Sequence, residues 1–166
     1  MFNAEALLEF SKRAYHSFEK LIEHCGSLDG NEFNRKIEGF GYPTIKLQLH
    51  HAIGAQKYWI GVLQGRIDID DDPDDKFTIG DMAEYHKAVL CITEDYLISA
   101  STEELNTARP MITWGNIEKE LIPAHVVIRT LTHLYHHLGQ VAAMCRLMNK
   151  PIAPGMDYPI LPRVGD

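Results

Sequence analysis

Hydrophobic residues recur at spacings of three and four in four segments of the chain, and each segment predicts an amphipathic helix. Polar and glycine-containing stretches separate these segments, as expected for the ends of helices. Four helices of about 20 residues in a chain of this length predict an all-α four-helix bundle. The four predicted helices cover about residues 3–25, 44–64, 79–99 and, beginning at Ile117 or Pro123, the residues as far as Met148.

The connections between these helices carry three further features. The acidic run 68–75 contains six aspartates, and Pro73 stands where a calcium-binding loop needs glycine, so we interpret the run as a solvated loop. The alternating segment 111–114 precedes a Gly-Asn turn and predicts an extended strand or a hairpin arm. The segment 151–166 contains four prolines and predicts an extended tail that packs across the body. We expect residues 1–166 to form a single domain.

Composition and charge restrict the possible partners. The 166 residues are 45% hydrophobic and 23% charged, which is typical of a globular protein. A net charge of −7 disfavours nucleic acid as a partner, because phosphate binding needs a clustered basic face. Three widely spaced cysteines without a CxxC motif indicate reduced thiols. We find no pattern of a signal peptide and no apolar stretch that approaches 18 residues, so we expect a cytoplasmic protein without a membrane partner.

The chain contains nine histidines, an unusually large number. The helical face on which each one lies determines whether it could contribute to a metal site inside the bundle. In the second predicted helix, a rotation of about 100° per residue places His50 on a polar face with Lys46 and turns His51 toward the apolar face. In the last predicted helix, His133 and His137 lie one turn apart at the edge of the apolar stripe, where both can bind one ion. From the residues alone, a metal site and a group of core histidines both remain open interpretations.

Two motifs of this sequence are similar to those of a known family. The last predicted helix reads HLYHHLGQ from His133, an HxxxHxGQ string, and the second reads HAIGAQKYW from His51. With the Trp-Gly-Asn turn before the last helix and the proline after it, these motifs resemble the DinB/YfiT-like superfamily over nearly the whole chain. The resemblance implies a bundle of four helices with one long crossover connection, commonly a homodimer. It also implies that the family's metal-binding histidines match His51, His133 and His137.

Two positions depart from the pattern of that family, and neither removes a ligand. Leu138 stands where members often have arginine, and Gln56 stands where they often have glutamate. Both positions bear on substrate contacts and on the charge around the ligands, because the partners of a metal ligand tune its orientation and basicity.

Three neutral histidine ligands leave an open coordination position, which is typical of a catalytic rather than a structural site. A divalent ion there lowers the pKa of a bound water or holds a thiol as the nucleophilic thiolate. The resemblance implies the same chemistry, because several DinB-like proteins are thiol S-transferases or isomerases. We therefore expect a divalent-metal-dependent transferase, with zinc or nickel, that activates a low-molecular-weight thiol for S-transfer to an electrophile.

Three more residues are candidates for contacts around this site, and no residue is assigned as the catalytic group. Gln140 lies one turn beyond His137 and is a candidate hydrogen-bond partner of a ligand or substrate, or of another helix. His86, on the inner face of the third predicted helix, is a candidate acid or base, or a core histidine. Tyr58, with its aromatic neighbours, lines a pocket or packs in the core.

Two alternatives to S-transfer stay open. A metal-dependent hydrolase would use the activated water and needs a carboxylate base, which no inward Asp or Glu adjoining these histidines in the sequence provides. A non-catalytic metal-binding or structural dimer, related to a stress response, is the other alternative. The expected partners are a small-molecule thiol and an electrophile.

Overall fold

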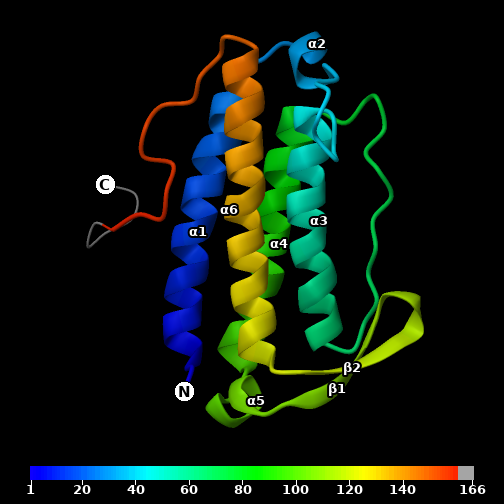
Figure 1. Ribbon diagram of the computed structural model, residues 1–166. Coiled ribbons are helices and arrows are strands. Elements are labelled where there is room, and N and C mark those ends of the chain that lie inside the picture. Colours follow the sequence, from blue (N-terminus) through cyan, green and yellow to red (C-terminus); the bar gives the residue numbers. More distant parts are fainter. Residues whose placement is uncertain (161–166) are drawn as a thin grey trace.

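The protein is a bundle of four long helices with a small hairpin at one end, as Figure 1 shows. The computed structural model describes residues 1–160. The predicted all-α bundle is confirmed, and its long helices are α1 (Ala4–Cys25), α3 (Ile45–Leu63), α4 (Ile79–Ser99) and α6 (Pro123–Leu147). The shorter elements are α2 (Gly30–Phe33), α5 (Thr102–Asn106), β1 (Arg109–Thr113), the 3-10 turn η1 (Trp114–Asn116) and β2 (Ile117–Leu121).

Polar side chains fix the starts of the helices close to the predicted positions. The side chain of Asn3 accepts a hydrogen bond from the first turn of α1, and Thr44 does the same for α3. Thr78 and Asp81 form a reciprocal capping box at the start of α4. The last helix begins at Pro123, whose missing N–H is not needed in the first turn of a helix. Of the two predicted starting positions, the second is therefore correct.

The segment before α6 forms the predicted hairpin arm and a second strand that the sequence pattern did not define. Strands β1 and β2 pair in antiparallel register, from Arg109 opposite Leu121 to Thr113 opposite Ile117. The turn between them uses positive φ angles at Gly115 and the following asparagine, which Gly and Asn adopt more readily than other residues. This hairpin carries Trp114 at its tip.

A long crossover joins α3 to α4, as the family resemblance implies. Helices α3 and α4 run in the same direction, and residues 64–78 return along the side of α3 between them (Figure 1). The acidic run belongs to this crossover. Its aspartates are mostly exposed, as predicted, but Asp70 is held in place, because Lys57 Nζ lies 2.6 Å from its carboxylate and the Tyr85 hydroxyl donates to it.

The polar face predicted for the second helix is not exposed at Lys46 and His50. They are only 5% and 9% exposed. The Lys46 ammonium donates to the backbone oxygen of Asp74, and the His50 ring packs against Phe77 and Tyr85. The crossover and α4 cover this face of α3, and a helical wheel contains no information about a loop that folds back over the helix.

The hydrophobic core runs the length of the bundle and is built from all four long helices. The described part of the predicted tail, residues 151–160, is extended and packs on α1, where Arg13 and Ser17 donate to the backbone oxygens of Pro159 and Asp157. Residues 161–166 of that tail lie outside the described residues. The largest fully buried side chains are Phe18, Leu21, Ile45, Leu49, Ile53, Ile60, Met82, Leu97, Leu105, Leu131, Leu134 and Met144.

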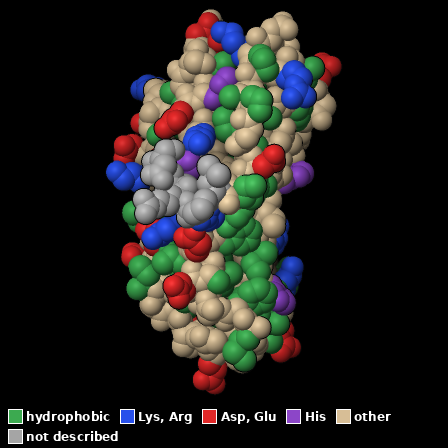
Figure 2. All heavy atoms as spheres, turned by 90° about the vertical axis from the view of Figure 1, so that its left-hand side faces the viewer, with side chains coloured by type: hydrophobic (Ala, Val, Ile, Leu, Met, Phe, Trp, Pro, Cys, Tyr) green, Lys and Arg blue, Asp and Glu red, His purple; other side chains and the backbone are tan. Residues whose placement is uncertain are grey.

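The surface carries mixed charge. On the face turned toward the viewer in Figure 2, acidic and basic side chains are interspersed, and neither sign forms a continuous patch. Among the described residues, no helix has both the length and the apolar character needed to cross a membrane.

The contacts of Asp70 predict how firmly the crossover is held. In Asp70→Asn, the loss of the carboxylate charge weakens the bonds from Lys57 and Tyr85. We expect backbone amides of residues 66–77 to exchange with deuterium a few-fold to about tenfold faster, as for the loss of roughly 1 kcal/mol. Asp71→Asn is the matched control, because no hydrogen bond or ion pair of Asp71 is seen within residues 1–160. Equal exchange in the two variants would contradict this role of Asp70.

Candidate metal centre

Helices α3 and α6 pack against each other and bring three histidines together. His51 comes from α3, and His133 and His137 from successive turns of α6. One ring nitrogen from each lies within 4.8 Å of the other two. His137 is buried, and His51 and His133 are half-buried. Helical periodicity predicted that these three side chains face inward, and the structure brings them together in one cluster.

The spacing of the imidazoles fits a metal ion. His133 Nε2 and His137 Nε2 are 3.2 Å apart. Two nitrogens bound tetrahedrally at about 2.1 Å from one ion lie about 3.4 Å from each other. A ring nitrogen of His51 lies within 4.8 Å of both, so a small movement of its side chain would bring it to the same spacing. The donor set, three imidazoles from two helices, is one that first-row divalent ions accept.

The protonation of the cluster also fits ligation. Burial, followed by the neighbouring histidines, lowers the pKa of His137 to about 3. Burial, His51 and then Arg129 lower the pKa of His133 to about 4. The pKa of His51 is lowered as well, mainly by burial. At neutral pH all three rings are therefore uncharged, and each can offer a nitrogen lone pair.

Gln48 fixes the orientation of His137, and sequence reasoning missed it. The Gln48 amide nitrogen donates to the Tyr42 backbone oxygen at 2.9 Å and to Gln140 Oε1 at 2.7 Å. Its oxygen lies 2.6 Å from His137 Nδ1 and is the acceptor there. His137 Nδ1 therefore carries the proton, and Nε2 is left free to face His133. Helical spacing places Gln48 one turn before His51, but glutamine is not a usual ligand of zinc or nickel, so no signal singled it out.

Gln140 is linked to the histidine cluster through Gln48. Its oxygen accepts from Gln48, and its amide nitrogen lies 2.6 Å from His136 Nε2. It therefore makes the interhelical hydrogen bond that was one of its two expected roles. Through Gln48 it positions the bond to His137.

Tyr42 forms one wall of the site and was also missed. Its ring stacks on His51, with centroids 4.0 Å apart and an interplanar angle of 20°. Tyr42 belongs to an irregular segment before α3, so helical periodicity gave no information about its direction.

A pocket of about 410 Å³ opens beside the cluster and includes His51 and His133 in its lining. Tyr58 lines it, which was one of the two roles predicted for this residue. Its hydroxyl accepts a hydrogen bond of 2.6 Å from the Trp114 backbone N–H. The tip of the hairpin is thereby fixed at the pocket edge. The remaining lining residues are Tyr42, His50, Gly54, Ala55, Trp59, Ile69, Asp70, Asp72, Trp114 and Arg129.

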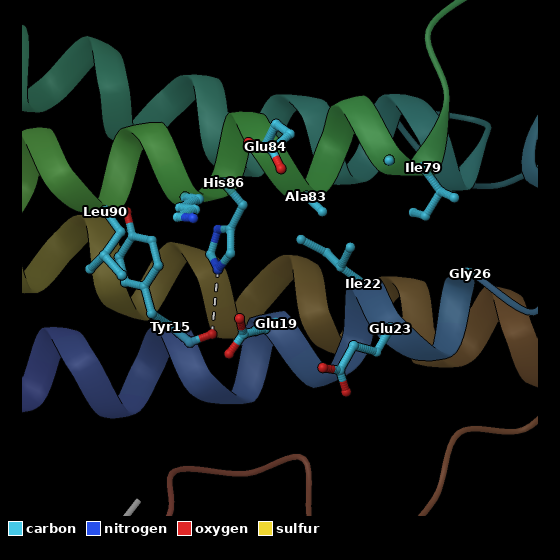
Figure 3. Close-up of a pocket in the computed structure, with 12 residues that line it drawn as sticks. Tyr15, Glu19, Ile22, Glu23, Gly26, Ile79, Ala83, Glu84, His86 and Leu90 are labelled. Atoms are coloured by element: carbon cyan, nitrogen blue, oxygen red, sulfur yellow. Dashed lines mark hydrogen bonds between the residues drawn. The ribbon is translucent and has the colours of Figure 1, made fainter. Parts of the chain in front are cut away.

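The structure does not bring His86 to this site. Figure 3 shows the His86 ring between α4 and α1, in the wall of a separate cavity of about 410 Å³. The ring stacks on Tyr15 at a centroid distance of 4.4 Å, and its Nε2 lies 3.4 Å from the Tyr15 backbone oxygen. His86 is thus a core histidine, which was the alternative expectation for it.

Comparison with protein families matches residues 13–141 to the DinB superfamily. This range contains all three clustered histidines and Gln48. A comparison with curated proteins finds no match.

The contacts of Gln48 predict its effect on metal binding. Gln48→Leu removes the acceptor of the His137 Nδ1 proton, and we expect zinc affinity, measured by competition with a chromophoric chelator, to fall about 10- to 100-fold. Gln56 was expected to bear on the surroundings of the ligands, but it bonds to Thr93 of α4 and does not line the pocket. Gln56→Leu is therefore the matched control, because Gln56 is an equally buried glutamine of α3. Similar affinities in the two variants would show that Gln48 does not act through His137.

Buried His86 predicts a pH dependence of stability. Burial lowers its pKa to about 4, against about 6.5 for an exposed histidine. Between these values the unfolded chain binds a proton that the folded chain does not, so the free energy of unfolding decreases as the pH falls from about 6.5 to 4. His86→Phe removes this contribution, and urea titrations should show a shallower decrease than in the unmodified protein. His125→Phe, at an exposed site of α6, is the control, and parallel pH curves for all three proteins would refute the prediction.

Proposed function

The chain belongs to the DinB superfamily, and we propose that it is a divalent-metal-dependent transferase that activates a low-molecular-weight thiol for S-transfer to an electrophile. The observation that carries the proposal is the cluster of His51, His133 and His137, two of which, His51 and His133, line a pocket large enough for a small molecule. Three protein ligands leave further coordination positions of an ion for a substrate.

The residues of the chain supply the setting for this chemistry. When bound to three neutral imidazoles, a divalent ion supplies positive charge that lowers the pKa of a thiol placed beside it. His51, His133 and His137 would hold the ion, and Gln48 keeps the proton of His137 on Nδ1. The Tyr42 ring stacks on His51 and covers one face of that imidazole, which helps to hold its ring in place.

Zinc and nickel are the proposed ions, because imidazole is a good ligand for both. The proposed partners are a small-molecule thiol and an electrophile. A homodimer stays a prediction from the family, and gel filtration tests it.

One observation favours metal-dependent hydrolysis as a second candidate. Asp72 lines the pocket from the crossover and is exposed, so the structure offers a carboxylate near the histidines that their sequence neighbours do not. A carboxylate in that position could take a proton from an attacking water. Asp70 is less suited to this role, because Lys57 and Tyr85 already bind it.

A thiol-conjugation assay separates these candidates. We expect tag-free protein loaded with zinc or nickel to conjugate cysteine-derived thiols to 1-chloro-2,4-dinitrobenzene or a bimane, at a rate that saturates with thiol concentration. The variant with His51, His133 and His137 all changed to alanine should lose the metal, measured by elemental analysis, and the metal-dependent part of the rate.

The other outcomes are equally definite. Metal-dependent cleavage of ester substrates without a thiol would replace S-transfer by hydrolysis, and Asp72→Asn should then lower that rate. Stoichiometric metal without turnover of either kind would indicate a non-catalytic metal-binding protein. Native protein that takes up neither zinc nor nickel would contradict the metal centre itself.

A further inference from the structure

We infer that Arg129 selects the thiol substrate, by binding a carboxylate that the same thiol carries. This inference rests on the proposed function and identifies the chemical class of its thiol. Arg129 lies on α6 one helical turn before His133, and it lines the pocket beside the clustered histidines. Side chains four residues apart on a helix are neighbours, so one small molecule can reach both an ion at His133 and the Arg129 guanidinium.

The Arg129 guanidinium is held in place but not paired. Its central carbon lies 5.0 Å from the ring centroid of Trp59 on α3, a cation–π contact. Within residues 1–160, no Asp or Glu oxygen lies within 4.0 Å of it, although the chain has 23 acidic residues and only 16 basic ones. A cation–π contact uses none of the guanidinium N–H groups as hydrogen-bond donors to an oxygen, so these groups stay available, and two of them match the two oxygens of a carboxylate.

The acidic residues that line the pocket, Asp70 and Asp72, come from the crossover and not from α6. Asp70 is bound by Lys57, so this pair adds little net charge. Asp72 is exposed and also belongs to the crossover. Arg129 comes from α6 and is the one Lys or Arg among the described residues that line the pocket. The wall formed by α6 is therefore the positive side of the pocket, and a carboxylate is favoured there over a neutral or cationic group.

Binding of simple thiols to cobalt-loaded protein tests this without any turnover. Cobalt replaces the divalent ion as a spectroscopic probe, and a thiol sulfur that binds cobalt gives a near-ultraviolet absorption band. The protein is titrated with 3-mercaptopropionate, which carries a carboxylate, and with neutral 2-mercaptoethanol. We expect the carboxylate thiol to bind about tenfold more tightly, the size of one charge-assisted hydrogen bond.

Variants locate the source of the preference. Arg129→Gln should remove the tenfold preference and leave the affinity for 2-mercaptoethanol unchanged, whereas Arg129→Lys should keep part of it. Arg146→Gln, an exposed arginine in the last turn of the same helix, is the matched control and should keep all of it. A preference that persists in Arg129→Gln would come from chelation of cobalt by the carboxylate and would overturn the role of Arg129.

The remaining outcomes distinguish this inference from the function on which it rests. Equal affinities of the unmodified protein for the two thiols would overturn the inference and leave thiol binding intact. Bound cobalt that accepts neither thiol would contradict both the inference and the S-transferase proposal.

Discussion

The candidate site depends on the packing of α3 against α6, because no single helix contributes all three histidines. His51 stands on α3, and His133 and His137 stand on successive turns of α6. The hydrogen bond from His137 to Gln48 crosses the same interface and sets the tautomer of the ring. Buried neighbours such as Leu49, Leu134 and Val141 hold the two helices at fixed distance, so the hydrophobic core determines the geometry of the polar site.

The crossover between α3 and α4 gives the site its pocket. Because α3 and α4 run in the same direction, the chain must return along the bundle, and it does so beside the histidines. This segment covers Lys46 and His50 and brings two aspartates to the pocket wall. The hairpin before α6 adds Trp114 at the pocket edge. The crossover and the hairpin thus add part of the surface that a substrate would meet, as is common for sites on rigid scaffolds.

The sequence predicted the parts of this structure that follow from local periodicity. The bounds of the long helices follow from spacing together with local capping residues, and the inward direction of His51, His133 and His137 follows from spacing within one helix. Gln48 and Tyr42 were not found, because their importance arises from contacts between elements distant in sequence. For the same reason, a helical wheel could not show that the crossover and α4 would cover the face of α3 that carries Lys46 and His50. The role of Arg129 likewise requires the position of Trp59 on another helix.

The central claim is that His51, His133 and His137 bind one divalent ion, and X-ray absorption spectroscopy of the zinc-loaded protein tests it most directly. We predict three imidazole nitrogens at about 2.0–2.1 Å, with any further ligand being a light atom from solvent or buffer. Addition of a bound thiol should then introduce one sulfur at about 2.3 Å. A spectrum with fewer than three imidazoles, or with sulfur before a thiol is added, would contradict the claim.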